Sequence, residues 1–374
     1  MTRAPRLLIV SPAPSHPADQ GNSARIRALG AALMARGVVC DFLYYATEGC
    51  SAAQREAMAG FWHALHILPP VPTGTMGFPG LWALDDWCDA SLVAHVAALQ
   101  RTWRYDAVLV NYVWMSRVLE GVPEAWGIID THDLFGERHL VARAAGIDPS
   151  WFFTTAAEEG RGLGRAKLVL AIQDEEAERL RQRGSAEVVT VGHLPPLRFL
   201  EAAPSDRVRA PFGYFGSANP WNVASVRALD AALARQRELP WLLAGRILDR
   251  RDLSLASTPL LLPQVPDPAD FYGAVACVLN PMVPGTGLKI KTVEALAHGM
   301  PVLGTKHAFS GLPAEHPGHR AADVPEMVAL MQVWRDSEAF RVELARASRL
   351  MALRYAASLA TQQDALAARL HGLV

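Results

Sequence analysis

The sequence predicts an α/β protein built from two doubly wound, Rossmann-like domains. Short apolar runs alternate with helix-like patterns through both halves of the chain, which is typical of parallel sheets with helices on both faces. The length of 374 residues also favours two domains, because single hydrophobic cores rarely grow beyond about 250–300 residues. A Pro-containing stretch at 193–196 precedes the expected junction near residues 195–210.

The strand candidates are short, apolar and bounded by turn residues. Those of the first half are Leu7–Ser11, Asp41–Tyr45, Ala64–Leu68, Ala107–Asn111, Gly127–Asp130, Leu168–Ile172 and Val188–Val191. Those of the second half are Gly213–Phe215, Trp241–Ala244, Leu260–Leu262, Ala276–Leu279 and Val302–Gly304. Helices are expected between them, for example Ser23–Arg36 and Ala90–Trp103.

Composition excludes several classes of protein. A net charge of −1 provides no overall field to attract nucleic acid or an anionic membrane. The 4 cysteines lack Cys-x-x-Cys spacing, which argues against a zinc site and a disulfide framework and favours a reducing compartment. The apolar run Leu7–Val10 is too short for a signal peptide, and no run approaches the ~18 apolar residues of a membrane span. We therefore expect a soluble, cytoplasmic protein.

Residues 276–305 carry the most functional information. A buried strand is followed by a loop with Gly285 and Gly287, a helix that begins near Leu288 and ends at Gly299, and a second strand. Because a βαβ crossover is right-handed, these strands are expected to be parallel, with the loop at the carboxyl edge where open sheets bind ligands. The free N–H groups at the helix start favour an anion such as phosphate.

The helix separates its residues by face. Ile290, Val293 and Leu296 recur at helical spacing and are expected to pack on the sheet, whereas Lys291 and Glu294 lie on another stripe. A lysine in the first turn, Lys289, opposes the helix dipole unless an anion pairs with it. A solvated Lys291–Glu294 pair is an equally good explanation of this stripe from spacing alone.

Two segments in the first half of the chain follow the ends of predicted strands. Gly21 precedes Ser23, a suitable N-cap, and Gly21 would allow close approach of a ligand; an ordinary loop is the commoner explanation. Arg25 and Arg27 follow and are expected to face solvent or to act indirectly. In Asp130-Thr131-His132-Asp133, two acids flank a histidine at a carboxyl edge. No further histidine or carboxylate pair is spaced to complete a metal site.

Residues 276–312 resemble the donor-binding signature of GT-B glycosyltransferases, in particular retaining glycosyltransferase family 4 (group 1). Glu294 matches the second glutamate of the family's Glu-x7-Glu, and the eight residues that follow it match the conserved tail. Thr286 stands at the first glutamate, as in a branch that reads Gly-Thr/Val-Gly-Leu-Lys-x-Lys. Because threonine replaces the first glutamate, the sugar-contacting role of that position is in question. The phosphate-binding role of the loop and the ribose-binding role of the second glutamate are expected to remain.

The resemblance implies an organisation and a set of site residues. It implies an acceptor-side domain at 1–200, a nucleotide-sugar-binding domain at 201–360 facing it across a cleft, and a helix at 361–374 crossing back. The implied catalytic residues are His132 and Lys289. The implied donor-binding residues are Gly21, Gly216, Ser217, Arg246, Val265, Thr286, Gly287, Leu288, Lys291 and Glu294. No metal or cofactor is implied.

The implied activity is transfer of a sugar from a UDP or GDP sugar to a glycan, lipid-linked or small-molecule acceptor, as in cell-envelope glycan synthesis. The family retains anomeric configuration, and a front-face, leaving-group-assisted route fits because no acid is clearly placed as a nucleophile. One alternative is a degenerate GT-B protein that binds nucleotide or a partner without turnover, and another is a sugar-nucleotide epimerase. Aromatic residues in 50–105 suggest an acceptor groove or peripheral contact with the inner membrane, although core positions are commoner.

Overall fold

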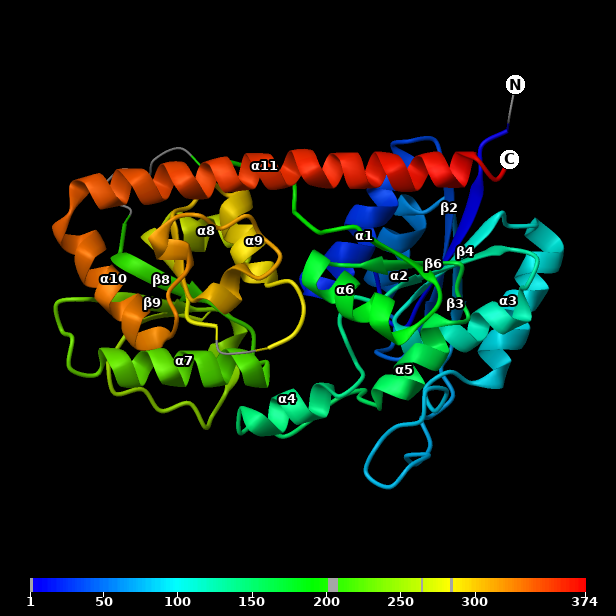
Figure 1. The fold of residues 1–374 in the computed structure, drawn as a ribbon, viewed down its shortest axis with the longest axis horizontal. Helices are drawn as coiled ribbons and strands as arrows, with labels where there is room; N and C mark the ends of the chain where they lie inside the picture. The colour runs from blue at the N-terminus through cyan, green and yellow to red at the C-terminus, as the bar shows by residue number, and fades with distance from the viewer. Residues whose placement is uncertain (1–2, 201–207, 264, 283–284) are drawn as a thin grey trace. The chain divides into compact units, whose positions relative to one another are not determined.

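A computed structural model describes residues 3–200, 208–263, 265–282 and 285–374. The chain forms two compact units (Figure 1). The first comprises the chain up to Leu140 together with Asp148–His193 and Leu359–Val374, and the second comprises Val141–Ile147 and Leu194–Ser358.

The first unit contains a seven-stranded sheet in the order β3-β2-β1-β4-β5-β6-β7, with parallel pairing throughout. Its strands are β1 Arg6–Ser11, β2 Val39–Tyr45, β3 Ala64–Leu68, β4 Ala107–Asn111, β5 Trp126–Asp130, β6 Leu168–Ala171 and β7 Glu187–Thr190. The strand order reverses direction between β1 and β4. Ligands of doubly wound sheets bind at the carboxyl ends of the strands beside such a reversal.

Helices connect these strands and begin at capping residues. They are α1 Gly21–Met34, α2 Ala52–Phe61, α3 Ala90–Trp103, the 3₁₀ helix η1 Val113–Gly121, α4 Arg138–Ala144, α5 Ala156–Leu163 and α6 Asp174–Arg183. Ser51 and Gln54 form a capping box at α2, Asp89 caps α3, and Thr155 caps α5. Each cap satisfies backbone N–H groups that the first helical turn cannot pair.

The second unit repeats the plan with a five-stranded parallel sheet in the order β10-β9-β8-β11-β12. Its strands are β8 Ala210–Phe215, β9 Trp241–Ala244, β10 Leu260–Leu262, β11 Val275–Asn280 and β12 Val302–Gly304. Its helices include α7 Pro220–Leu233, α8 Pro268–Tyr272, α9 Ile290–Ala297 and α10 Val324–Asp336, with 3₁₀ turns at Arg246–Asp249, Lys306–Phe309 and Pro317–His319. The reversal here lies between β8 and β11.

The structure confirms the predicted α/β class and every predicted strand, with ends that move by three residues at most. Two helix predictions were wrong in extent. The helix expected from Ser23 begins at Gly21 with Gln20 as N-cap, and Ser23 is buried. The helix expected over 361–373 is the end of α11 Glu338–His371, whose buried residues continue at helical spacing through Leu344, Met351 and Leu359.

A close contact between α1 and the end of α2 occurs at a glycine in α1. An added Cβ on Gly30 would lie 2.2 Å from the Trp62 ring, which is buried and stacked on Phe42. Gly60 in α2 is a matched control, because a Cβ there meets nothing within 4 Å.

We predict that Gly30→Ala lowers the free energy of unfolding by about 1–3 kcal/mol, because overpacking outweighs the gain in helix propensity. Gly60→Ala should raise it by about 0.5–1 kcal/mol through helix propensity alone. Urea denaturation measures both values. Equal effects of the two substitutions would contradict the packing of α1 on Trp62.

Candidate functional site

In the first unit, His132 follows β5 and Asn111 ends the neighbouring strand β4. His132 Nε2 lies 2.8 Å from Asn111 Oδ1. The Asn111 amide nitrogen donates to the carbonyl oxygen of Val10 at 3.0 Å, which orients the amide so that Oδ1 is the acceptor. His132 therefore carries its proton on Nε2, and its Nδ1 has an available lone pair.

His132 also stacks on Tyr112 in an uncommon backbone conformation. The two rings are 4.3 Å apart at an interplanar angle of 26°. Both residues have positive φ, 59° for His132 and 74° for Tyr112. Non-glycine residues held in this region cost about 1–3 kcal/mol each and occur disproportionately at functional sites.

A buried ion pair lies behind His132. Arg25 donates from Nε and Nη2 to the Asp130 carboxylate at distances of 2.6–3.0 Å, and from Nη1 to the carbonyl of Gly192 at 3.0 Å. Arg25 is 2% exposed and Asp130 is 0% exposed. Of the two alternatives for Arg25, exposure to solvent was wrong, whereas an indirect role fits its contact with Asp130 behind His132.

These surroundings determine the charges of the cluster. Burial raises the pKa of Asp130, but the Arg25 guanidinium outweighs it and leaves that pKa below its ordinary value. Burial lowers the pKa of His132 to about 4, although Asp130 opposes the shift. His132 is therefore neutral near pH 7 and can accept or donate a hydrogen bond without carrying charge.

Gly21 begins α1 beside this cluster. The next residue, Asn22, lies near the Tyr112 hydroxyl and lowers its pKa against the effect of burial, and Tyr112 stacks on His132. The structure thus brings the predicted residues Gly21 and His132 into one neighbourhood of the first unit.

In the second unit, predicted donor-binding residues follow β8 and β9. The N–H of Gly216 donates to the Ala244 carbonyl at 2.9 Å, and a Cβ on Gly216 would lie 2.6 Å from the Tyr214 ring. Ser217 is exposed and its hydroxyl accepts from the Asn222 amide at 2.9 Å. The Arg246 side chain is 75% exposed, 3.9 Å from Asp249.

The loop before α9 is organised around Lys289. Its ammonium donates to the carbonyl oxygens of Thr286 at 2.7 Å and Gly287 at 2.6 Å. Lys289 is the N-cap residue of α9 and is buried, as are Gly287 and Leu288. Gly287 has a φ of 77°, which glycine adopts at little cost. The predicted contact of Lys289 with a diphosphate stays a prediction.

Lys291 and Glu294 lie one turn apart on α9 and influence each other. Burial lowers the pKa of Lys291 and raises that of Glu294, and each charge partly offsets the shift of the other. Glu294 also lies near Tyr272, where burial and this carboxylate raise the pKa of the phenol, and the Tyr272 ring stacks on His298 with ring centroids 4.5 Å apart. This is not the fully solvated pair that helical spacing alone allows.

The remaining predicted donor residue, Val265, is half-buried and packs against the core beneath β8–β12. Among the described residues, no three His, Cys, Asp or Glu side chains are grouped so as to hold a metal ion. No helix in the described part of the chain is long and apolar enough to cross a membrane. Sequence reasoning did not identify Asn111 or Tyr112 as site residues, because their contacts come from distant parts of the chain.

Comparisons with known proteins identify a family pattern in the second unit and the fold of the chain. Residues 211–332, within the second unit, match the family model described as "Glycosyl transferases group 1". No curated protein matches significantly. Sucrose-phosphate synthase from Thermosynechococcus elongatus is similar with a TM-score of 0.73 at 17% identity, over 100% of both chains.

Two further solved structures are similar over nearly the whole chain. Anabaena HepE in complex with UDP and glucose has a TM-score of 0.70 at 16% identity, over 98% of this chain and 99% of that one. A glycosyltransferase from Rickettsia africae has a TM-score of 0.66 at 11% identity, over 100% and 99%. The chain has the GT-B fold, as its sequence predicted, and the resemblance to group 1 glycosyltransferases is confirmed.

The tautomer of His132 is directly measurable. We predict that long-range ¹H–¹⁵N NMR of histidine-labelled protein shows neutral His132 protonated on Nε2 at pH 7, with His132→Gln identifying the signal. Asn111→Asp should raise the pKa of His132 by about 1 unit or more, because an adjacent carboxylate favours imidazolium.

The sign of the stability effect follows from the same pKa. Because the folded value, about 4, lies below the ordinary value of 6.5, protons bind the unfolded chain preferentially between these limits. This histidine's contribution to stability is present above pH 6.5 and is lost as the pH falls toward 4. An Nδ1–H tautomer, or an imidazolium at pH 7, would contradict the assignment.

Proposed function

We propose that this protein transfers a glycosyl group from a UDP or GDP sugar to an acceptor, with retention of configuration and without a resident metal. The observation that carries the proposal is the environment of Lys291 at the start of α9. Among the described residues, Lys291 has no hydrogen-bond partner and no carboxylate within ion-pair distance, and the nearest aromatic ring is Phe215 at 5.8 Å.

The Lys291 side chain is half-buried, and burial lowers the pKa of its ammonium. A charged group in such surroundings is stabilised when an anion pairs with it. Phosphate oxygens at the α9 N-terminus would supply both the negative charge and the hydrogen bonds. Residues 276–305, which carry the group 1 pattern, contain this lysine, and the family model matches the same region. These two facts support a nucleoside diphosphate as the ligand.

The chemistry assigned to each residue follows from its charge state. Lys291 and the α9 N-terminus would stabilise the departing diphosphate, which is the main requirement of the reaction. Glu294, whose carboxylate lies near Tyr272, would accept from the ribose hydroxyls. Neutral His132 would accept a hydrogen bond from a sugar hydroxyl through Nδ1.

The stereochemical course is proposed as a front-face displacement. In that route the acceptor hydroxyl gives its proton to the departing phosphate oxygen while the new glycosidic bond forms on the face that the leaving group vacates. No protein nucleophile is needed, which is consistent with a sequence in which no acid is clearly placed to attack. We also propose a cytoplasmic location and a glycan or lipid-linked acceptor of the cell envelope.

Thr286, at the position of the first motif glutamate, favours one second candidate: a nucleotide-binding protein without turnover. Incubating the protein with a panel of UDP and GDP sugars and measuring the released nucleoside diphosphate distinguishes the two. The enzyme should release nucleoside diphosphate from one donor, and His132→Ala should slow release roughly 100-fold with little change in donor affinity. Tight donor binding without release would favour the second candidate.

Substitution of the lysines should change the affinity for a nucleoside diphosphate more than the affinity for the nucleoside. Lys291→Ala should weaken the nucleoside diphosphate roughly tenfold or more, and the nucleoside little, because a charge-assisted phosphate contact is lost. Calorimetry with UDP and uridine, or with GDP and guanosine, measures this difference.

The same measurement on Lys289→Ala distinguishes a phosphate contact of Lys289 from a structural role in the loop. A loss confined to the diphosphate would assign Lys289 to phosphate, whereas equal weakening of both ligands would assign it to the loop carbonyls that it contacts. If Lys291→Ala weakened both ligands equally, the phosphate role of Lys291 would be wrong.

A further inference from the structure

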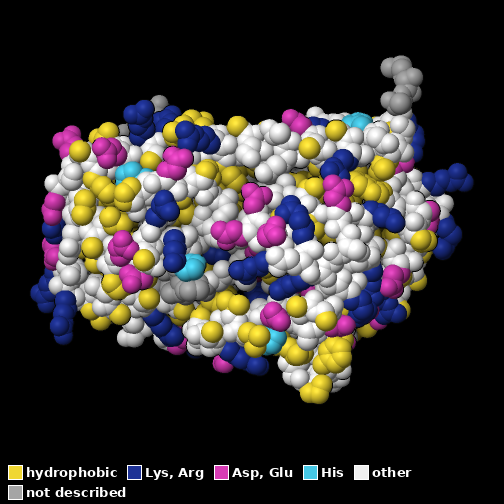
Figure 2. Space-filling view, viewed as in Figure 1, with side chains coloured by type: hydrophobic (Ala, Val, Ile, Leu, Met, Phe, Trp, Pro, Cys, Tyr) yellow, Lys and Arg dark blue, Asp and Glu magenta, His cyan; other side chains and the backbone are white. Residues whose placement is uncertain are grey.

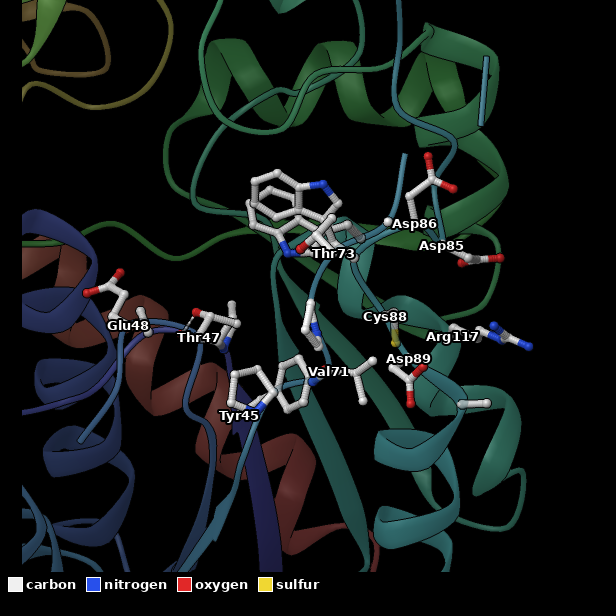
Figure 3. Close-up of a pocket in the computed structure, with 18 of the residues that line it drawn as sticks. Tyr45, Thr47, Glu48, Val71, Thr73, Asp85, Asp86, Cys88, Asp89 and Arg117 are labelled. Carbon is white, nitrogen blue, oxygen red and sulfur yellow. Dashed lines mark hydrogen bonds between the residues drawn. The ribbon is translucent and has the colours of Figure 1, made fainter. Parts of the chain in front are cut away.

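A cavity of about 390 Å³ lies within the first unit (Figure 3). Its walls come from the chain just after β1, β2 and β3, from residues 85–90 before α3, and from the aromatic residues Trp114 and Trp151. It therefore lies at the carboxyl edge of the sheet, where α/β proteins bind ligands. Neither the ion pair nor His132 forms its wall.

A ladder of aromatic rings connects this cavity to His132. His132 stacks on Tyr112, and Tyr112 stacks on Trp114 with centroids 4.3 Å apart and an interplanar angle of 7°. Trp114 in turn meets the edge of Trp151 at 4.9 Å. The indole N–H of Trp87, another lining residue, is buried without a partner among the described residues.

Trp151 combines two properties that the buried rings around it do not share. Its side chain is 44% exposed, and its backbone has a φ of 67°. The strained conformation and the exposed indole together present an aromatic face at the cavity. The apolar faces of sugar rings pack well on such a surface.

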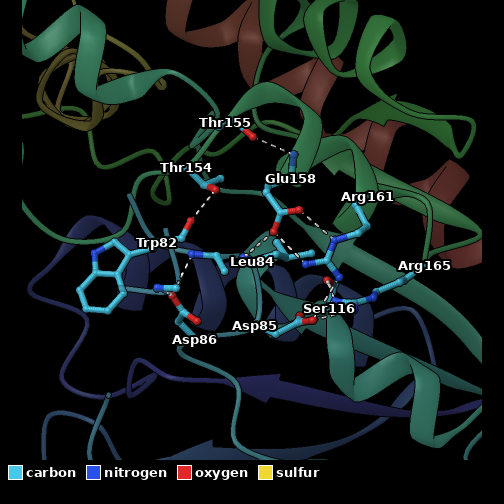
Figure 4. A network of polar contacts seen from close by, with 12 residues as sticks. Trp82, Leu84, Asp85, Asp86, Ser116, Thr154, Thr155, Glu158, Arg161 and Arg165 are labelled. Carbon is cyan, nitrogen blue, oxygen red and sulfur yellow. Dashed lines mark hydrogen bonds and ion pairs between the residues drawn. The ribbon is translucent and has the colours of Figure 1, made fainter. Parts of the chain in front are cut away.

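Polar contacts hold one wall of the cavity in place (Figure 4). Asp85 is paired with Arg165 at 2.5 Å and with Arg161 at 3.2 Å. Just before it, the N–H of Leu84 donates to Glu158 at 2.9 Å, and the Thr154 hydroxyl donates to the Trp82 carbonyl at 2.7 Å. These bonds join residues 82–85 to 154–165, so the wall is formed before a ligand arrives.

The charges of the cavity are predominantly negative. Asp86 accepts from the N–H groups of Gly77 and Ala83, and Asp89 accepts from that of Ser91. Among the described residues neither forms an ion pair, although Arg117 adds to the hydrogen bonds from Ser91 in lowering the pKa of Asp89. Glu48 has no hydrogen-bond or ion-pair partner among the described residues. Arg117 is the sole basic side chain in the lining, and in Figure 3 it lies on the opposite side from Glu48.

We propose that this cavity binds a neutral sugar ring of the acceptor, stacked on Trp151 and hydrogen-bonded through its hydroxyls to Glu48 and Asp89. Carboxylates accept from hydroxyl groups and repel phosphate or carboxylate, so phosphorylated sugars should be excluded. Assigning the ring to an acceptor rests on the proposed function. The binding chemistry itself rests on the cavity.

An acyl chain is the competing occupant, because an apolar loop adjoins the cavity. Val71, Met76 and Phe78 are each between 38% and 45% exposed, and Figure 2 shows hydrophobic side chains gathered on the protruding tip that carries this loop. An acyl chain inside the cavity would remove Glu48, Asp86 and Asp89 from water without replacing their hydrogen bonds, which is costly. The sugar ring is therefore the better fit.

The test measures binding directly by tryptophan fluorescence and calorimetry. Wild-type protein is titrated with methyl glycosides and methyl disaccharides of the common hexoses, with the 6-phosphates of the same sugars, and with decanol as the alkyl probe. We expect a neutral glycoside to bind, its 6-phosphate to bind at least about tenfold more weakly, and Trp151→Ala to weaken the glycoside roughly tenfold.

Trp103→Ala is the matched control, since Trp103 is 43% exposed on α3 and does not line the cavity. Glu48→Gln should narrow the discrimination against the 6-phosphate by about threefold, because one negative charge is removed. The proposal is overturned if no neutral glycoside binds, if the 6-phosphate or decanol binds more tightly, or if Trp103→Ala weakens binding as much as Trp151→Ala. Since no nucleotide sugar is present, loss of donor turnover would not affect these results.

Discussion

The buried pair of Arg25 and Asp130 is the interaction on which the site of the first unit depends. It joins α1, the end of β5 and the carbonyl of Gly192 beyond β7. Removing one partner of such a pair leaves an uncompensated buried charge, which typically costs about 3–5 kcal/mol. Because the carboxylate of Asp130 is occupied by Arg25, Asn111 rather than Asp130 makes the close contact with His132 Nε2, whose distance to Asp130 Oδ2 is 3.6 Å. The Asp130 carboxylate is thus paired with Arg25, while the nearby His132 imidazole remains neutral.

The second unit uses the same parallel sheet plan to place charged side chains at the carboxyl edge of its strands. Its parallel strands place the ends of β8, β9 and β11 at one edge, and α9 begins after the last of these. Lys289 donates to the carbonyl oxygens of the preceding loop, whereas Lys291 and Glu294 are half-buried, with Phe215 and Tyr272 as neighbours. An anion and hydroxyl groups are the ligands that these charges would best accommodate.

Sequence patterns predicted the fold well because strand burial is encoded locally. Each strand is a short apolar run, and runs such as Ala107–Asn111 and Trp241–Ala244 required no knowledge of distant residues. Glu294 and His132 could also be predicted from the sequence. Glu294 lies in a family pattern, and His132 follows closely after a predicted strand. The Arg25–Asp130 pair joins residues 105 positions apart, and no local periodicity reports such a contact.

The cavity of the first unit could not be predicted from sequence for a related reason. Trp114 and Trp151 meet only because the loops after two different strands converge, and Trp151 needs a positive φ that its residue type does not suggest. The aromatic residues in 50–105 were compatible with an acceptor groove, a membrane contact or the core, and their spacing did not distinguish these alternatives. The carboxylates that favour a sugar ring, such as Glu48 and Asp89, were unremarkable in the sequence.

The central claim is that the second unit binds a nucleoside diphosphate at the start of α9. Hydrogen–deuterium exchange of the whole protein, with and without saturating UDP or GDP, tests it without requiring turnover. The account predicts slower exchange in peptides covering 285–298 and 215–219, and loss of that protection in Glu294→Ala. The control Glu343→Ala, an exposed position on α11, should retain it. Protection that is absent with both nucleotides, or that occurs elsewhere and persists in Glu294→Ala, would contradict the account.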